Sequence, residues 1–324
     1  MKRASLKSIA AEAGVAKTTA SLVLNNKGDQ YQINKETQKR ILNAAKNQNY
    51  NPSYLAKTLS SGNTGTIGII CERINSWYLS NLLHHLSLEL NSISLLLIPC
   101  ITNQTNRVTI IEELIQRQPE AIIVTNNLDL QYIKKSSIPY YGTVISLVET
   151  PGINKVNNIY SKIESHINIL LHESIRLSKK AIGFIGETDS DNRALDAYLK
   201  SYIDRFEIKT DYTELIKTDN NIADAVLTLQ NKNVNAIIFE SNRLLTIYLN
   251  KIKKRGLKVV QNVHLFSIGY NPRFYHSEAP IGSTSISAEE VAKRITKIAE
   301  SRKRREEYEP TDITLTPLLI KNYS

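Results

Sequence analysis

The stretch SLKSIAAEAGVAKTTASLVLNN, residues 5–26, holds the residue types that a small DNA-binding motif requires. Gly14 can take the left-handed conformation of a tight turn, and Ala10 is small enough for two helices to pack closely. If a second helix follows the turn and lies in the major groove, its outward side chains face base edges. This spacing favours a helix-turn-helix, although any small helical hairpin would show the same pattern.

Three short helices are expected to position these side chains. Ser5 is placed to cap the first helix and Gly14 ends it. The second spans 17–24, and Asn34 caps the third after a loop at 25–29. Apolar residues at helical spacing mark the inner faces. These are Leu6, Ile9, Ala10 and Ala13 in the first helix, Ala20, Val23 and Leu24 in the second, and Thr37, Ile41, Leu42, Ala44 and Ala45 in the third.

Composition and charge place this motif at the end of a larger globular chain. The 324 residues are 41% hydrophobic and 22% charged, which is ordinary for a globular protein of about two domains. Of the net charge of +10, residues 1–62 contribute +7, from ten Lys or Arg and three Asp or Glu, and the rest of the chain only +3. A basic segment attached to a balanced body suggests a nucleic-acid module joined to something else.

Several classes of protein are excluded. No run of 18 apolar residues is present, so we expect no membrane-spanning helix and no membrane partner. The basic start MKRASLKSIAAEAG lacks the apolar segment of a secretory signal. Cys71 and Cys100 are too few for a disulfide framework, and we expect each to lie reduced in a core. The cytoplasm is therefore the expected compartment.

From about residue 66 the pattern changes to apolar runs that alternate with amphipathic stretches. Strands are expected at 66–70, 93–98, 121–125, 143–147, 181–186, 213–217, 236–240, 263–269 and 313–320. Helices are expected between most of them, at 77–91, 107–117, 160–177, 191–206, 221–231, 243–255 and 287–305. This alternation indicates parallel α/β sheets covered on both faces. Nine strands fit two similar lobes, with a first break near 151–155.

The residues after the helical motif carry a resemblance to a known family. Residues 50–62 read YNPSYLAKTLSSG, and together with 5–26 they resemble the LacI/GalR (lactose-repressor) family of bacterial transcription regulators. The headpiece positions that match the family pattern are Ser5, Leu6, Ile9, Ala10, Ala13, Gly14, Val15, Thr19, Ser21, Val23, Leu24 and Asn25. The hinge positions that match it are Tyr50, Pro52, Ala56 and Leu59. The resemblance continues weakly through the body to the ending LTPLLIKNYS.

The resemblance implies a fold and its domains. The fold is an all-α helix-turn-helix headpiece plus a hinge helix, followed by an α/β two-lobed body with parallel sheets, similar to periplasmic binding proteins. The headpiece spans 1–49, the hinge 50–62 and the body 63–324. Within the body, the first lobe takes about 63–153 and 287–308, and the second about 154–286 and 309–324.

The resemblance also implies DNA contacts. Lys17, Thr18 and Leu22 occupy the base-reading positions. Leu22 stands where the family commonly has Arg, so a guanine contact is lost and a thymine methyl could be covered instead. The residues implied to bond phosphates, which fix the register of the protein on DNA, are Ser5, Thr19, Ser21 and Asn25. Ala56 and Leu59 would lie at the minor groove, with the leucine wedged between bases. An ordinary core role for Leu59 stays open.

The ligand lobe departs further from the family pattern. The positions that align with effector contacts are Trp77, Tyr78, Arg193, Asn242 and Asn271. The aromatic rings could stack on a sugar or base, and Arg193 aligns with an arginine that grips effector oxygens in the family. The two Asn stand where the family has acidic residues, so a neutral pocket without charge-assisted bonds is expected. Packing roles for the rings and a surface role for Arg193 remain alternatives.

No catalytic motif is present. The sequence has no G-x-S-x-G, no G-x-x-x-x-G-K-S/T and no G-x-G-x-x-G, and its six His lack zinc-ligand spacing. We therefore expect no enzyme, cofactor or metal. The expected protein is a homodimeric repressor that binds a pseudo-palindromic double-stranded operator at the nucleoid, with a sugar-like effector that shifts its DNA affinity. The alternative is a regulator of the same fold whose body binds a protein partner or no ligand.

Overall fold

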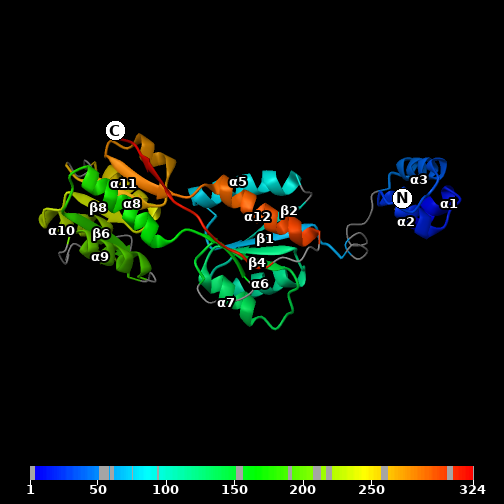
Figure 1. Ribbon diagram of the computed structural model, residues 1–324, viewed down its shortest axis with the longest axis horizontal. Helices are drawn as coiled ribbons and strands as arrows, with labels where there is room; N and C mark the ends of the chain where they lie inside the picture. The colour runs from blue at the N-terminus through cyan, green and yellow to red at the C-terminus, as the bar shows by residue number, and fades with distance from the viewer. Residues whose placement is uncertain are drawn as a thin grey trace. The chain divides into compact units, whose positions relative to one another are not determined.

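The computed structural model describes residues 4–50, 58, 62–74, 76–92, 95–150, 156–188, 192–206, 213–216, 221–256, 262–304 and 309–323. The chain divides into two compact units, Met1–Asn63 and Thr64–Ser324. We call them the headpiece unit and the body (Figure 1). The hinge predicted at 50–62 lies mostly outside the described residues, so its helix stays a prediction.

The headpiece unit contains three helices, α1 (Leu6–Glu12), α2 (Lys17–Leu24) and α3 (Lys35–Asn47). Ser5 caps α1 as predicted, because its side chain accepts a hydrogen bond from the backbone N–H of Ser8. Gly14 follows with a φ of 63°, a left-handed conformation that suits glycine. Asn34 caps α3 by accepting a hydrogen bond from the N–H of Glu36. Local signals in the sequence were therefore enough to predict all three helices.

A small apolar core holds the three helices together. Its buried members are Ile9, Ala10, Ala13, Ala20, Val23, Ile41, Ala44 and Ala45. Gln48, directly after α3, accepts a hydrogen bond from the Ser8 hydroxyl at 2.6 Å and so ties the end of α3 to α1. The prediction that Leu42 faces inward is wrong, since this side chain is 50% exposed. Leu42 follows Ile41 directly, and the next residue on a helix turns away by about 100°.

The first lobe of the body is a parallel sheet covered on both faces. Its strand order is β11-β5-β4-β3-β1-β2. The strands are β1 (Thr66–Cys71), β2 (Leu96–Ile101), β3 (Ala121–Val124), β4 (Thr143–Ser146), β5 (Val156–Tyr160) and β11 (Asp312–Thr314). Helices α5 (Trp77–Ser92) and α12 (Ala288–Lys303) share one apolar core with the sheet. Helices α6 (Arg107–Gln116) and α7 (Asn127–Lys135) share a second core with it. The two helix pairs thus cover opposite faces (Figure 1).

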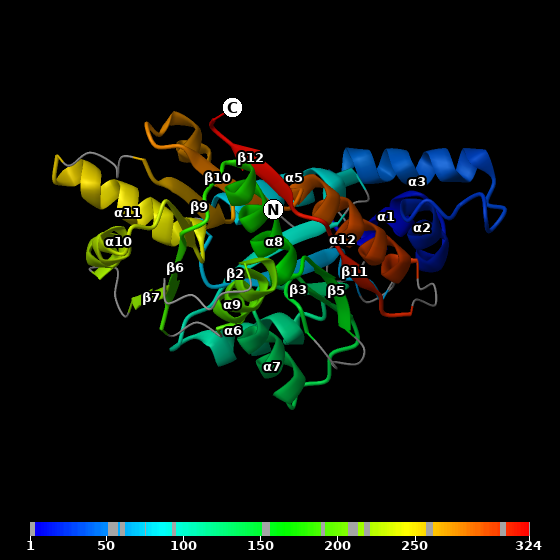
Figure 2. The same cartoon turned by 60° about the vertical axis from the view of Figure 1, so that its left-hand side comes forward.

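The second lobe repeats this plan. Its strand order is β12-β10-β9-β8-β6-β7, with only β12 antiparallel to its neighbour. The strands are β6 (Ile182–Glu187), β7 (Thr213–Ile216), β8 (Ala236–Phe239), β9 (His264–Ile268), β10 (Ile281–Ser285) and β12 (Leu318–Lys321). One core includes α8 (Ile163–Arg176) and α9 (Arg193–Phe206), and the other α10 (Ile222–Asn231) and α11 (Asn242–Lys254). A 3-10 helix, η2 (Pro272–His276), precedes β10. Strands β9, β10 and β12 lie side by side in Figure 2. The predicted fold class is confirmed for the headpiece and the body.

The predicted boundary between the lobes needs correction. The predicted second lobe begins at 154, yet strand β5 pairs with β4 and β11 in the first sheet. The same prediction places 309–324 in the second lobe, but β11 belongs to the first sheet and only β12 to the second. The single strand predicted at 313–320 is divided at 315–317, where Pro317 cannot donate a ladder hydrogen bond. Among the described residues, the chain crosses between lobes near 161–162, 286–287 and 315–317.

The two cysteines lie on the neighbouring parallel strands β1 and β2, and their side chains point to opposite faces of the sheet. Cys71 pairs with Ile101 and Cys100 pairs with Ile70, so the two thiols point to opposite faces of the first sheet. Burial raises the pKa of both thiols. Both are free, as the sequence predicted. Within the described part of the chain, no helix combines the length and the apolar character needed to cross a membrane.

Candidate DNA-binding surface and ligand pocket

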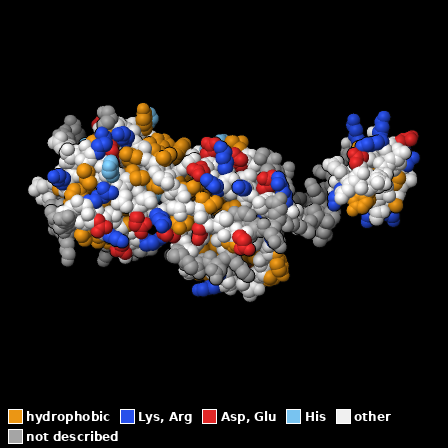
Figure 3. Space-filling view, viewed as in Figure 1, with side chains coloured by type: hydrophobic (Ala, Val, Ile, Leu, Met, Phe, Trp, Pro, Cys, Tyr) orange, Lys and Arg blue, Asp and Glu red, His pale blue; other side chains and the backbone are white. Residues whose placement is uncertain are grey.

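Helix α2 presents the predicted base-reading side chains on its outer face. Lys17 and Thr18 are exposed in its first turn, and Leu22 is half-buried one turn later. The opposite face of α2 carries Ala20 and Val23, which are buried in the headpiece core. Fixing that face against α1 and α3 leaves the side chains at the start of α2 free to meet another molecule. On the face shown in Figure 3, Lys and Arg side chains predominate on the headpiece, whereas the body carries both signs of charge.

The four predicted phosphate contacts differ in their existing hydrogen bonds. The Ser5 hydroxyl oxygen accepts a hydrogen bond from the N–H of Ser8 at 3.2 Å, which leaves its hydrogen able to donate to a phosphate. Asn25 Nδ2 donates to the backbone oxygen of Ser21 at 2.9 Å and to its hydroxyl at 3.4 Å. Thr19 and Ser21 are half-buried, and Asn25 is exposed. Ser21 and Asn25 thus act as one polar group at the end of α2.

The loop between α2 and α3 is braced by Asp29. Its carboxylate accepts a hydrogen bond from Gln38 Nε2 at 2.8 Å and pairs with Lys35 Nζ at 2.6 Å. These hydrogen bonds, with the charge of Lys35, hold the pKa of Asp29 below its usual value. The loop is therefore tied to α3 by contacts that sequence reasoning did not identify.

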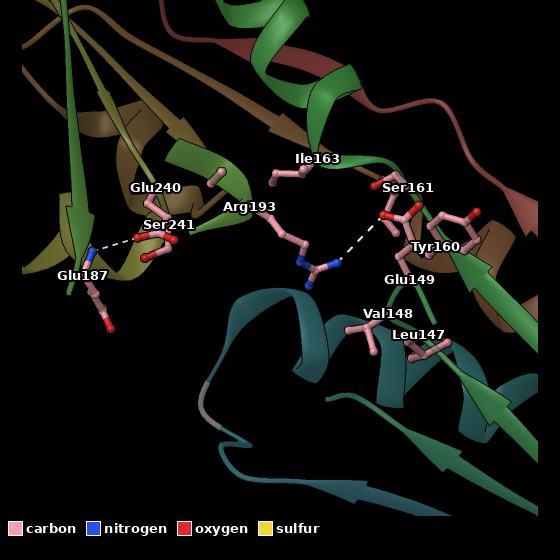
Figure 4. Close-up of a pocket in the computed structure, with 12 residues that line it drawn as sticks. Leu147, Val148, Glu149, Tyr160, Ser161, Ile163, Glu187, Arg193, Glu240 and Ser241 are labelled. Carbon is pink, nitrogen blue, oxygen red and sulfur yellow. Dashed lines mark hydrogen bonds and ion pairs between the residues drawn. The ribbon is translucent and has the colours of Figure 1, made fainter. Parts of the chain in front are cut away.

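A cavity of about 400 Å³ opens in the body, where strands from both sheets end. From the first lobe it is lined by Glu149 after β4 and by Tyr160 and Ser161 at the end of β5. From the second lobe it is lined by Glu187 at the end of β6 and Glu240 after β8. The other lining residues are Leu147, Val148, Ile163, Arg193, Ala194, Ser241 and Ile286. The carboxyl ends of parallel strands are the usual place for a ligand in such sheets (Figure 4).

The polar groups of the cavity are organised around carboxylates. Arg193, the first residue of α9, reaches from the second lobe toward the first, with Nη1 at 3.8 Å from Glu149 Oε2 (Figure 4). Glu240 Oε2 accepts a hydrogen bond from the backbone N–H of Glu187 at 2.8 Å. The side chain of Glu187 forms an ion pair with Arg243. The cavity can therefore offer carboxylate and hydroxyl oxygens to a polar ligand.

Comparison with known proteins supports the same division of the chain. Residues 5–53 match the family model "Bacterial regulatory proteins, lacI family". A sucrose operon repressor from Klebsiella pneumoniae is 34% identical over 139 residues. That alignment covers 42% of this chain and 42% of the relative, so the chain matches less than half the length of this curated relative. The headpiece, over residues 5–53, is therefore of the lacI type. The family consists of transcription regulators, not enzymes.

Two further comparisons extend over the body of the chain. The transcriptional regulator RegA from Clostridium saccharobutylicum is 25% identical over 292 residues, which cover 83% of each chain. A crystal structure of the lac repressor dimer bound to operator and the anti-inducer ONPF superposes with a TM-score of 0.79 at 13% identity, covering 99% of each chain. At that identity the superposition shows the fold: a helical headpiece followed by a two-lobed body.

The structure brings only one of the five predicted effector residues, Arg193, to the cavity. Trp77 is 47% exposed in the first turn of α5, and Tyr78 packs against the first-lobe core, where burial raises its pKa. Asn242 Nδ2 donates to the backbone oxygen of Tyr270 at 3.0 Å. Asn271 caps η2 by accepting a hydrogen bond from the N–H of Arg273. The two amides therefore make local structural bonds.

The expectation of a neutral pocket is wrong. Glu149, Glu187 and Glu240 line the cavity, and all three follow or end a strand. The sequence contained this signal, because Glu187 and Glu240 stand at the carboxyl ends of two predicted apolar strands. Alignment to the family drew attention to Asn242 instead, two residues further along the chain. Among the described residues, no group of His, Cys, Asp and Glu is arranged to hold a metal ion.

His166 lies beside the cavity in the first turn of α8. Its two ring nitrogens contact residues next to two of the segments where the chain crosses between the lobes, 161–162 and 286–287. Its Nε2 is 2.5 Å from the hydroxyl of Ser161, which lines the cavity, and its Nδ1 is 2.8 Å from the hydroxyl of Thr284 on β10. A neutral imidazole can donate at one nitrogen and accept at the other. Burial lowers the pKa of His166 to about 4, which keeps the ring neutral at neutral pH.

This shift predicts acid-dependent stability. The pKa of His166 is lower in the folded chain than the ~6.5 of an unfolded chain. The neutral ring thus stabilises the fold fully above about pH 6.5, and this stabilisation is lost as the pH falls toward 4. We expect a loss of roughly 2 kcal/mol by pH 5, from about 1.4 kcal/mol per pH unit. Urea unfolding at pH 7 and pH 5 measures it. A His166→Gln variant should lose less stability over this interval, and equal losses would assign the acid sensitivity to other groups.

Proposed function

We propose that this chain is a transcription regulator that binds a pseudo-palindromic DNA operator as a homodimer, acts as a repressor, and responds to a small sugar-like molecule in the body. The observation that carries the proposal is a basic helix-turn-helix unit joined to a two-lobed body with a polar cavity. The names of a sucrose operon repressor and of a lac repressor dimer bound to operator support the same activity. The cytoplasm, at the nucleoid, is the proposed location.

In this proposal the outer face of α2 meets the major groove. Lys17 donates to guanine O6 or N7, Thr18 contacts a neighbouring base edge, and Leu22 covers a thymine methyl. The residues proposed to hold phosphates are Ser5, Thr19, Ser21 and Asn25. Ala56 and Leu59 are proposed for the minor groove at the centre of the operator, and both lie outside the described residues.

The first lobe supplies a surface that supports the homodimer. Strand β2 is the edge of its sheet, and Leu96 and Ile101 on it are 60% and 46% exposed. Leu88 on α5 and Val108 on α6 are 59% and 48% exposed. An edge strand with exposed apolar side chains tends to associate with another chain. A sedimentation mass of 36.6 kDa, that of one chain, would contradict the dimer.

The proposed response to the effector is a shift between body conformations. A ligand that contacts both walls of the cavity stabilises one relative position of the lobes, because only that position completes its contacts. The bonds of His166 to Ser161 and Thr284 connect the cavity wall to two of the lobe crossings. A dimer that changes the spacing of its headpieces in this way would lose or gain operator affinity through a coupling free energy.

Replacing Lys17 by alanine tests the DNA-binding surface. On an operator selected from randomised duplexes, we expect the variant to lose roughly 1–3 kcal/mol of binding free energy per bidentate base contact and to accept more bases at that position. Fluorescence-anisotropy titration of the operator and of single-base variants measures both. Lys254→Ala, at the end of α11 in the body, is the matched control and should bind as the parent does.

Salt dependence separates the possible roles of Lys17. The parent protein should lose affinity steeply as salt rises, since phosphate contacts release counterions. If Lys17→Ala lowers affinity equally on operator and random DNA and reduces the salt slope by about one, Lys17 contacts phosphate instead of a base. If the parent binds no selected duplex in a salt-dependent way, the proposal of a DNA-binding regulator is wrong.

A further inference from the structure

We infer that the cavity of the body selects a ligand that carries an amino group, an amino sugar in preference to a neutral or phosphorylated sugar. The inference rests on the proposal that this cavity is the effector site, and it names the class of effector. It is carried by the excess of carboxylates over cations among the lining side chains.

The charges of the lining do not balance. Glu149, Glu187 and Glu240 contribute three carboxylates, and Arg193 is the one cation among the described lining residues. Arg193 faces Glu149, with 3.8 Å between Nη1 and Oε2. Arg243 lies outside the lining and pairs with Glu187. Even when Arg243 is counted with Arg193, the three lining carboxylates exceed these two cations by one.

The second-lobe wall gathers its carboxylates by strand pairing. Strands β6 and β8 are neighbours, with Ile185 opposite Phe239. Glu187 ends the first of these strands and Glu240 follows the second, so both arise at the same edge of the sheet. The hydrogen bond from the Glu187 N–H to Glu240 Oε2 places the Glu240 carboxylate against that edge (Figure 4). A ligand that contacts this wall therefore meets the Glu240 carboxylate, beside the end of the neighbouring strand β6.

The cost of desolvating the lining carboxylates makes the cavity selective for a ligand that carries a positive charge. A ligand between the lobes displaces water from the carboxylates, and a buried carboxylate without a compensating charge is costly. An ammonium group on the ligand supplies that charge and donates up to three charge-assisted hydrogen bonds. A phosphate would add a like charge to the same wall. Hydroxyl groups on the ligand can bond to Ser161, Ser241 and Tyr160, which also line the cavity.

Matched sugars test the inference on the full chain at pH 7. We would measure thermal stabilisation and calorimetric affinity with glucose, glucosamine, N-acetylglucosamine and glucose 6-phosphate, and with the corresponding galactose and mannose series. In at least one series the free amine should bind about tenfold or more tightly than its neutral parent, as expected for one charge-assisted bond in place of a neutral one. The N-acetyl and phosphate forms should show no such gain.

A single variant ties the preference to the second-lobe wall. Glu240→Gln removes the charge but keeps an oxygen that can accept the hydrogen bond from the N–H of Glu187. It should lose about tenfold in affinity for the amino sugar and little for the neutral parent. Glu113→Gln, on the exposed side of α6, removes one carboxylate elsewhere and should leave both affinities unchanged.

The outcomes are distinct. Tighter binding of a neutral or phosphorylated sugar than of its amine overturns the inference while leaving an effector in the cavity. No binding of any amino sugar also overturns it, and intact operator binding would then show that the regulator proposal survives without this ligand class. If Glu240→Gln leaves the preference for the amine unchanged, the ammonium group of the ligand does not bind at this wall. That result would also contradict the inference.

Discussion

Replacing Ile41 by alanine is expected to abolish tight operator binding while leaving the body folded. Ile41 is fully buried in a headpiece core of eight buried residues. Truncating a buried Ile costs roughly 2–5 kcal/mol, a large share of the stability of so small a unit. If the folded fraction of each headpiece falls about tenfold, the apparent affinity of a dimer falls about a hundredfold. Operator titration and a circular-dichroism melt measure the two effects.

Leu42→Ala is the matched control because it removes a similar side chain at the next position of α3. Leu42 is 50% exposed, so little packing is lost and operator affinity should change little. The melting transition of the body should be the same in both variants, since Ile41 lies in the separate headpiece unit. Equal losses in both variants, or a body transition that moves with Ile41→Ala, would contradict this assignment of the core.

The headpiece could be predicted well because its signals are local. Ser5, Gly14 and Asn34 act on residues within one helical turn, and the spacing of Ile9, Ala20 and Val23 reports directly which faces are buried. The error at Leu42 arose where two apolar residues stand side by side on α3. Periodicity alone does not decide which of the two faces inward.

The body was predicted less completely because two of its strands are polar. Strand β5 contains Asn157 and Asn158, both buried, and β10 contains Ser283 and Thr284, also buried. Their side chains are satisfied by partners far along the chain, such as Thr143 for Asn157 and His166 for Thr284. A strand stabilised by such bonds has no apolar run to reveal it. Missing β5 also displaced the predicted boundary between the lobes.

The cavity depends on residues that only the fold brings together. Glu149 and Glu240 are 91 positions apart in sequence, and they meet one cavity because β4 and β8 end toward it. Of the second-lobe residues that the family resemblance implied, Arg193 lines this cavity, whereas Asn242 and Asn271 do not. These amides are used locally, at the start of α11 and as the cap of η2. Strand ends were a better guide to the lining of this cavity than aligned residue types.

A buried charge network lies where the strands of the first lobe end, and breaking it is expected to have the second large effect, on the stability of the body. Asp129 is fully buried in the first turn of α7, and Arg107 at the start of α6 is 5% exposed. Arg107 Nε donates to Asp129 Oδ1 at 2.7 Å, and its terminal nitrogen pairs with Glu72 after β1. Asn126 Nδ2 donates to Asp129 Oδ2 at 2.6 Å, directly after β3. The network thus joins the ends of strands to two helices.

Arg107→Met is expected to destabilise the body by about 3–5 kcal/mol, since it leaves the Asp129 carboxylate buried without a compensating charge. Urea unfolding of the full chain, followed by the transition of the body, measures the loss. Lys293→Met is the matched control on α12. It breaks an exposed pair with Glu289, in which the side chains are 57% and 55% exposed, and it should hardly change the transition.

The double variant Arg107→Met with Asp129→Asn decides whether the loss comes from the unpaired charge. The Asp129→Asn change removes that charge and keeps an oxygen for Asn126 and Thr102, which also contacts the Asp129 carboxylate. We expect the double variant to recover at least half of the stability lost in Arg107→Met, because a neutral polar pair costs much less to bury than one uncompensated ion. A double variant as unstable as Arg107→Met would assign the loss to the packing of the Arg107 side chain. A loss below about 1 kcal/mol in Arg107→Met alone would mean that water reaches Asp129 and that the pair behaves as an exposed one.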